Sequence, residues 1–180
     1  MKLVSGLIHV ISLVLYRMIG MRLPHTFWPC GVVFSRIRKL LLTGMGCKVG
    51  IDCEIEPHVD VGFRPNLVIG NNCQLNQNTT LKSVIMGDDV MIAPGVVFLD
   101  RSHNFSRTDI SMREQGESSR RITNIDNDVW IGQNAIIFPG LKIGEGVIVG
   151  AGSVVTSDLP AWTVAAGAPA RVIRSRVKEK

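Results

Sequence analysis

Residues 125–155 read IDNDVWIGQNAIIFPGLKIGEGVIVGAGSVV, and within them an aliphatic residue returns at every sixth position. These residues are Ile125, Ile131, Ile137, Ile143, Val149 and Val155. Neither a helix, whose side chains repeat every 3.6 residues, nor a strand, whose side chains alternate, requires such a repeat. A solenoid of short strands does require it, because each hexapeptide forms one side of a coil and points its aliphatic residue inward.

The six-residue rhythm continues, with slips, through most of the chain. Earlier runs start at Val49, Ile69 and Met86, and the period indicates about three coils over residues 49–103 and about three over residues 122–173. Glycine and asparagine permit a left-handed backbone at the corners. We therefore predict an all-β protein with a parallel β-helix over residues 47–175, between a helical N-terminal segment of residues 1–46 and a basic, solvated C-terminal tail of residues 176–180.

Composition limits the class of protein. Of the 180 residues 46% are hydrophobic and 19% are charged, which excludes a disordered chain, and a chain of this length does not need disulfides for its stability. Only 6% are aromatic, which leaves few rings for stacking bases, so we expect no nucleic-acid partner. The four cysteines form no CxxC pair, as is typical of a reduced, cytoplasmic protein.

The first 48 residues differ from the rest, because they hold seven basic residues and no acidic one. Residues 3–16 are uncharged and mostly apolar, and at about 14 residues they are too short to span a bilayer. As a helix they would carry one narrow polar stripe, formed by Ser5, His9, Ser12 and Tyr16. A break between Pro24 and Pro29 precedes a second short helix, which we predict over residues 31–42.

These apolar, basic helices allow two interpretations. They resemble a peripheral membrane anchor, which would associate through residues 1–42 with the inner face of a membrane. They fit equally well a helical cap that covers the start of the solenoid and helps it to oligomerise. Both interpretations stay open at this point.

Three stretches carry a family resemblance: DVWIG at 128–132, GAGSVVT at 150–156 and AGAPARVI at 166–173. They resemble the hexapeptide-repeat acyltransferases, in particular the galactoside, maltose and xenobiotic O-acetyltransferases and the polysaccharide O-acetyltransferases. The similarity covers about residues 44–175. It implies a left-handed parallel β-helix, a homotrimer and acetyl-CoA as co-substrate. The handedness comes from the resemblance alone, since right-handed crossovers are the general rule.

The repeat breaks after His103 and resumes at residue 122. The intervening stretch, NFSRTDISMREQGESSRR, holds seven charged residues, and long loops without structure of their own are usually functional. A neutral imidazole is a natural base near pH 7, and the resemblance places the catalytic histidine of the family at His103. We predict that Asp100 orients this imidazole, with a solvated turn aspartate as the alternative.

The resemblance also implies the residues that bind the co-substrate. The pantetheine slot would be lined by Trp130, Gln133, Ala151, Thr156 and Ser157, and the nucleotide end would be bound by Arg171 and Arg174. Plain packing is the alternative for Trp130. The family often carries lysine where Ser157 stands. Asn76 resembles an asparagine that touches the sugar in the galactoside enzymes, and a structural asparagine at a solenoid corner is the alternative. The nearby acidic contact of those enzymes has no clean match here.

Taken together, these features predict an acetyl-CoA-dependent O-acetyltransferase that acts on a carbohydrate hydroxyl of a surface polysaccharide or lipopolysaccharide precursor. No cysteine is well placed as a nucleophile, which favours direct transfer in a ternary complex, and we expect no metal. The alternatives are a soluble acetyltransferase of small free sugars or xenobiotics and a non-enzymatic trimeric β-helix scaffold. A three-histidine zinc site, as in the γ-class carbonic anhydrases, would require His9 or His25 to join His58 and His103.

Overall fold

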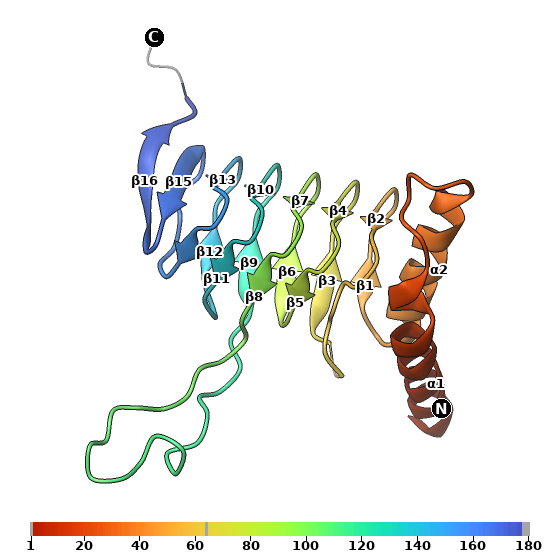
Figure 1. Ribbon diagram of the computed structural model, residues 1–180, viewed down its shortest axis with the longest axis horizontal. Coiled ribbons are helices and arrows are strands. Elements are labelled where there is room, and N and C mark those ends of the chain that lie inside the picture. Colours follow the sequence, from red (N-terminus) through yellow and green to blue (C-terminus); the bar gives the residue numbers. More distant parts are fainter. Residues whose placement is uncertain (1, 64, 178–180) are drawn as a thin grey trace.

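The computed structural model describes residues 2–63 and 65–177 and shows a long solenoid with helices at one end (Figure 1). The helices are α1 (Lys2–Met18) and α2 (Gly31–Gly44), with a short 3-10 helix, η1 (Gly20–Arg22), between them. Met1 and residues 178–180 of the predicted tail lie outside the described residues. The second predicted helix, over residues 31–42, is confirmed by α2.

The strands that follow are mostly two or three residues long. They are β1 (Lys48–Val49), β2 (Glu54–Ile55), β3 (Leu67–Ile69), β4 (Gln74–Leu75), β5 (Thr80–Leu81), β6 (Val84–Met86), β7 (Met91–Ile92), β8 (Val97–Phe98), β9 (Thr123–Ile125), β10 (Trp130–Ile131), β11 (Ile136–Ile137), β12 (Lys142–Ile143), β13 (Ile148–Val149), β14 (Val154–Val155), β15 (Thr163–Gly167) and β16 (Ala170–Ser175).

Stacking of these strands from coil to coil forms three sheets in the described part of the chain. The first sheet has the order β1-β3-β6-β9-β12, the second β2-β4-β7-β10-β13-β15-β16, and the third β5-β8-β11-β14. Every pairing is parallel except that of β15 with β16, which is antiparallel and closes the C-terminal end. The predicted parallel β-helix, with a helical N-terminal segment and a protruding loop, is confirmed (Figure 1).

The residues of the hexapeptide repeat form the core. All six aliphatic residues from Ile125 to Val155 are buried, and burying a side chain of this size contributes about 1.5–3 kcal/mol. The corners show the expected left-handed backbone, with φ of 60° at Asn78, 58° at Asn134 and 66° at Gly152. Small or amide side chains at these corners therefore let the chain turn after each short strand.

The C-terminal end is tied to the solenoid more closely than the sequence predicts. The guanidinium of Arg176 donates to the Gly146 carbonyl at 2.5 Å, lies 3.4 Å from the Asp128 carboxylate and stacks over the Trp162 ring. The Trp162 ring itself covers Gly146, where a Cβ atom would come within 2.3 Å of it. Arg176 is therefore not part of a solvated tail, because three partners from three successive coils bind its side chain.

The two helices cover the N-terminal end of the solenoid, as the helical-cap interpretation predicts. α2 packs on β1 and β2, and α1 packs on α2. The helical stretch Val4–Arg22 has a mean hydropathy of 1.7 with 11% of it buried, so its length and composition suffice for a membrane span. The expectation that this segment is too short was wrong, because the helix continues past residue 16 into η1. Length and composition alone do not distinguish a span from a signal sequence or a surface helix.

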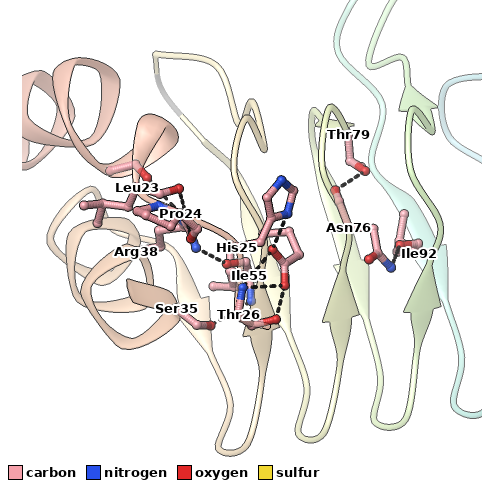
Figure 2. A network of polar contacts seen from close by, with 12 residues as sticks. Leu23, Pro24, His25, Thr26, Ser35, Arg38, Ile55, Asn76, Thr79 and Ile92 are labelled. Atoms are coloured by element: carbon pink, nitrogen blue, oxygen red, sulfur yellow. Dashed lines mark hydrogen bonds and ion pairs between the residues drawn. The ribbon is translucent and has the colours of Figure 1, made fainter. Parts of the chain in front are cut away.

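Buried polar contacts join the cap to the first coil (Figure 2). Arg38 of α2 is fully buried, and its guanidinium donates to carbonyl oxygens of four residues. The distances are 3.0 Å to Gly20, 2.9 Å to Ile55 and 2.7 Å to Pro24, and Leu23 is the fourth acceptor. Because η1, the following turn and β2 all contribute acceptors, one side chain fixes the path of the chain from α1 into the solenoid.

We expect Arg38→Met to lower the free energy of unfolding by at least about 3 kcal/mol, because it leaves several buried carbonyls without a donor. Arg36→Met on the exposed side of the same helix is the matched control and should stay within about 0.5 kcal/mol of the wild type. Urea denaturation followed by circular dichroism measures both values. Equal midpoints for the two variants would contradict this role of Arg38.

Candidate active site

His103 lies at the mouth of the long loop, where the chain leaves the third sheet after β8. The two arms of the loop pair there: His103 forms an antiparallel bridge with Glu117, and the Ser118 amide donates to the Ser102 carbonyl at 2.8 Å. The Asn104 amide donates to the Gly116 carbonyl at 3.0 Å. The backbone of His103 is thus held by the opposite arm, while its side chain is exposed.

Asp100 is buried at the same mouth but does not contact the imidazole. One carboxylate oxygen forms an ion pair with Nε of Arg120 at 3.1 Å, and the other lies 3.7 Å from Nε of Arg101. Arg101 in turn pairs with Glu117 at 2.5 Å. No hydrogen bond joins Asp100 to His103 within the described ranges. In one chain Asp100 therefore holds the loop arms together, and it does not orient the imidazole as predicted.

A cavity of about 250 Å³ opens beside the loop mouth. It is lined by Phe63, Lys82, Asp100, Arg101 and Arg120, among others. The sequence analysis did not single out the three cations that line this cavity, Arg101, Arg120 and Lys82. The high charge of the loop is the only feature of the sequence that points to a polar cluster here. Which cations come to line the cavity with Asp100 depends on how the two arms of the loop fold back.

Asn76 lies in the turn between β4 and β5, and its side-chain amide donates to the Ile92 carbonyl at 2.9 Å (Figure 2). Its own carbonyl accepts from the Thr79 hydroxyl at 2.7 Å. The side chain thus bridges two successive coils. It is half-buried, so it has a structural role whether or not it also touches a substrate.

The predicted site residues fall on two borders of the third sheet. We call the border where the chain passes from the third to the first sheet the His103 edge, and the border where it enters from the second sheet the Asn76 edge. Backbone hydrogen bonds stack Leu99, Phe138 and Thr156 on one another in three successive coils. Because neighbouring strands are about 4.8 Å apart, Thr156 and Ser157 lie about 10 Å along the His103 edge from the loop mouth.

The remaining predicted residues lie elsewhere on the C-terminal coils. Gln133 and Ala151 are stacked on the Asn76 edge, where the Gly152 amide donates to the Gln133 carbonyl at 2.8 Å. Trp130 lies just before this edge in β10 with 46% of its surface exposed. Arg171 and Arg174 are exposed on β16. A single chain thus brings His103, Thr156 and Ser157 to one edge and Asn76, Gln133 and Ala151 to the other.

The cysteines of the solenoid lie far from the loop mouth, in its first two coils. Cys73 is buried, and Cys53 lines a cavity of about 390 Å³ against α2 together with Lys39 and Arg36. Interaction with the neighbouring Cys73 thiol lowers the pKa of the Cys53 thiol to about 6, whereas burial raises the pKa of Cys47 to about 12. No thiol therefore lies beside His103 in the part of the chain that the structure describes. That part also contains no group of three or more His, Cys, Asp or Glu residues placed to hold a metal ion.

The lowered pKa makes alkylation of Cys53 pH-dependent. Because the thiolate is the reactive form, labelling of Cys53 by iodoacetamide should rise between pH 5 and 7 and level off above pH 7, following a pKa of about 6. Cys73→Ala removes the neighbouring thiol that lowers the pKa of Cys53 and should move the profile to higher pH. Peptide mass spectrometry over a pH series measures both. A Cys53 profile that still rises above pH 8 in the wild type would contradict the assignment.

Comparison with known proteins gives consistent matches. Residues 122–157 match the family described as bacterial transferase hexapeptide (six repeats). The chain is 39% identical over 140 residues to galactoside O-acetyltransferase of Escherichia coli (strain K12). This aligned region covers 76% of this chain and 68% of that protein. It is 30% identical over 183 residues to the lipopolysaccharide biosynthesis O-acetyltransferase WbbJ of the same organism, which covers 86% of this chain and 93% of that protein.

A solved structure of galactoside acetyltransferase in complex with coenzyme A matches the fold with a TM-score of 0.78 at 33% identity, over 96% of this chain and 82% of that one. The chain therefore belongs to the hexapeptide-repeat acetyltransferase family. The predicted family and the predicted enzyme class, an O-acetyltransferase, are confirmed.

Proposed function

We propose that this protein transfers the acetyl group of acetyl-CoA to a carbohydrate hydroxyl of a surface polysaccharide or lipopolysaccharide precursor. The observation that carries the proposal is the fold match to a coenzyme A complex over 96% of the chain. The polysaccharide class is supported by the alignment with WbbJ, which covers 93% of that protein. The matching region thus extends well beyond the six repeats at residues 122–157.

In the proposed mechanism His103 is the general base. Its neutral imidazole accepts the proton of the acceptor hydroxyl while that oxygen attacks the thioester carbonyl. When the tetrahedral intermediate collapses, the carbon–sulfur bond breaks and the imidazolium returns the proton to the coenzyme A thiolate. The acetyl group passes directly from sulfur to oxygen. The position of Cys53 and Cys73 in the first two coils supports this direct transfer, because neither thiol lies near the loop mouth.

We further propose that the active enzyme is a homotrimer whose sites lie between subunits. Within one chain the His103 edge and the Asn76 edge are separated by the whole third sheet, β5-β8-β11-β14. A second copy that places its Asn76 edge against the His103 edge of the first would unite His103, Thr156 and Ser157 with Asn76, Gln133 and Ala151. Repetition of this heterologous contact closes into a ring of three.

The co-substrate would lie along this junction. Trp130 offers an exposed apolar surface for pantetheine, and Arg171 and Arg174 offer positive charge for the phosphates. Asp100 keeps a positioning role in this proposal, through the loop arms that hold the backbone of His103. The acceptor would enter beside the loop mouth, and the enzyme would work in the cytoplasm at the inner face of the membrane, with residues 1–42 associated with it.

A second candidate function is acetylation of small free sugars, which the 39% identity to galactoside O-acetyltransferase favours. A transfer screen with acetyl-CoA against purified sugars and lipid-linked oligosaccharides, read by mass spectrometry, separates the two. Acetylation of the lipid-linked acceptors supports the main proposal. Acetylation of free sugars alone supports the second candidate, and absence of transfer to either kind of acceptor would contradict both.

His103→Ala should reduce turnover about 10²- to 10⁴-fold, because it removes the base. Coenzyme A affinity and oligomer mass should not change, since the side chain is exposed. Thiol release from acetyl-CoA measures turnover, and calorimetry measures affinity. His58→Asn is the control, because asparagine tolerates the left-handed backbone of 58° at that corner. Normal turnover of His103→Ala would end the assignment of the base.

Arg174→Ala should weaken coenzyme A binding about tenfold, because a charge-assisted hydrogen bond to phosphate is worth about 1.5 kcal/mol or more. The change should appear in the KM for acetyl-CoA with little effect on kcat. Lys142→Ala removes an exposed cation with 65% of its side chain accessible and is the matched control. Unaltered affinity in Arg174→Ala would exclude this arginine from the phosphate site.

A further inference from the structure

α1 turns its polar side to the protein and its apolar side to solvent, the reverse of an ordinary surface helix. The polar residues Ser12 and Tyr16 are 9% and 1% exposed. The residues of the opposite side are all about half exposed or more, with 61% for Leu7 and 53% for Val14. We call this side the apolar face of α1; it consists of Val4, Leu7, Ile11, Val14 and Met18.

Contacts along the polar stripe keep the apolar face outward. The Tyr16 hydroxyl donates to the Val59 carbonyl at 2.7 Å, and Nδ1 of His9 lies 2.9 Å from the Met45 carbonyl. At the end of the helix the Arg17 guanidinium binds the Asp60 carboxylate at 2.8 Å. Rolling the helix to bury its apolar face would break all three contacts and leave polar groups without partners. These contacts therefore hold α1 in the orientation that exposes its apolar face to solvent.

A cation lies at the C-terminal end of the apolar face, and two aromatic residues are exposed in the segment that follows the helix. The Arg22 guanidinium donates to the carbonyls of Arg17 and Met18, which places a cation at the C-terminal end of the face. Phe27 and Trp28 are exposed in the turn that follows. In the sequence, no acidic residue precedes Asp52. An apolar helix face, a cation at its end and an N-terminal segment without acidic residues match the boundary between acyl chains and anionic headgroups.

We propose that α1 docks on an anionic phospholipid bilayer, with its apolar face among the acyl chains and its axis along the membrane surface. The purpose of this contact, which is to bring the loop mouth to a lipid-linked acceptor, rests on the proposed function. The contact itself follows from the exposed residues and their charge, and its test does not depend on acetyl transfer.

The same contacts argue against two other arrangements. A helix that crosses the bilayer would carry the polar stripe away from Val59, Met45 and Asp60, so a surface orientation preserves bonds that a span would lose. An isologous contact with a second copy would bring two sets of basic residues together without acidic partners from the same segment, which is electrostatically unfavourable. An anionic lipid surface is complementary both to the apolar face and to the positive charge of the N-terminal segment.

Flotation of the full-length protein with vesicles tests the proposal. The wild type should float with vesicles of phosphatidylcholine and phosphatidylglycerol, less with phosphatidylcholine alone, and less when salt rises from ~0.05 to ~0.5 M. Leu7→Glu should reduce the bound fraction about tenfold or more, because it places a charge among acyl chains. Absence of wild-type binding, or equal binding of Leu7→Glu, would overturn the proposal.

Met112→Glu is the matched control, since Met112 on the long loop is 64% exposed, compared with 61% for Leu7, and the change in charge is the same. It should float like the wild type, and thermal unfolding should confirm that both variants are folded. A wild type that resists extraction from the vesicles with alkaline carbonate would overturn the surface orientation in favour of a span. A smaller oligomer for Leu7→Glu with unchanged flotation would show that a second copy covers the face.

Turnover of acetyl-CoA with a purified lipid-linked oligosaccharide as acceptor is measured on the same preparations. Protein that turns over but does not float overturns the docking proposal and leaves the proposed function intact. Protein that floats, loses binding in Leu7→Glu and shows no turnover supports docking and counts against the proposed function. The two failures are therefore distinguishable.

Discussion

In-register stacking of one buried aliphatic residue per strand is the constraint on which this structure depends. In the second sheet each such residue packs directly on its equivalents in the coils before and after it. The column consists of Ile55, Leu75, Ile92, Ile131, Val149 and Ala165. A shift of one residue in any strand would turn the aliphatic side chain outward. The register therefore determines which positions become corners, and the corners carry every candidate site residue except those of β10 and β16.

The loop at residues 104–121 shows what happens where this constraint is relaxed. Its arms have no coil to stack on, so they pair with each other through His103 and Glu117 and are held by the buried carboxylate of Asp100. A polar cluster substitutes there for an aliphatic core. The exposed imidazole is thus mounted on a rigid base, because β8 and β9 on either side of the loop stay in register with their neighbours.

At the N-terminal end, the constraint creates a different problem. The first coil has no preceding coil, and its backbone and core need a cover. The helices supply it, with the Arg38 guanidinium satisfying carbonyls of η1, the following turn and β2. α1 meets the same end through its polar stripe, which leaves its apolar face outside. Covering the end of the solenoid and exposing an apolar surface are thus two consequences of one arrangement.

The spacing of residues along the chain is enough to predict the period, and with it the parallel solenoid, the buried aliphatic positions, the left-handed corners and the location of the loop. These follow from local spacing, because one residue type recurs every six positions. The direction in which α1 presents its stripe, the partners of Asp100 and the division of the candidate site between two edges were decided by the tertiary structure. Each depends on groups far apart in the chain, such as Tyr16 with Val59 or Asp100 with Arg120, and a periodic pattern holds no information on which distant groups meet.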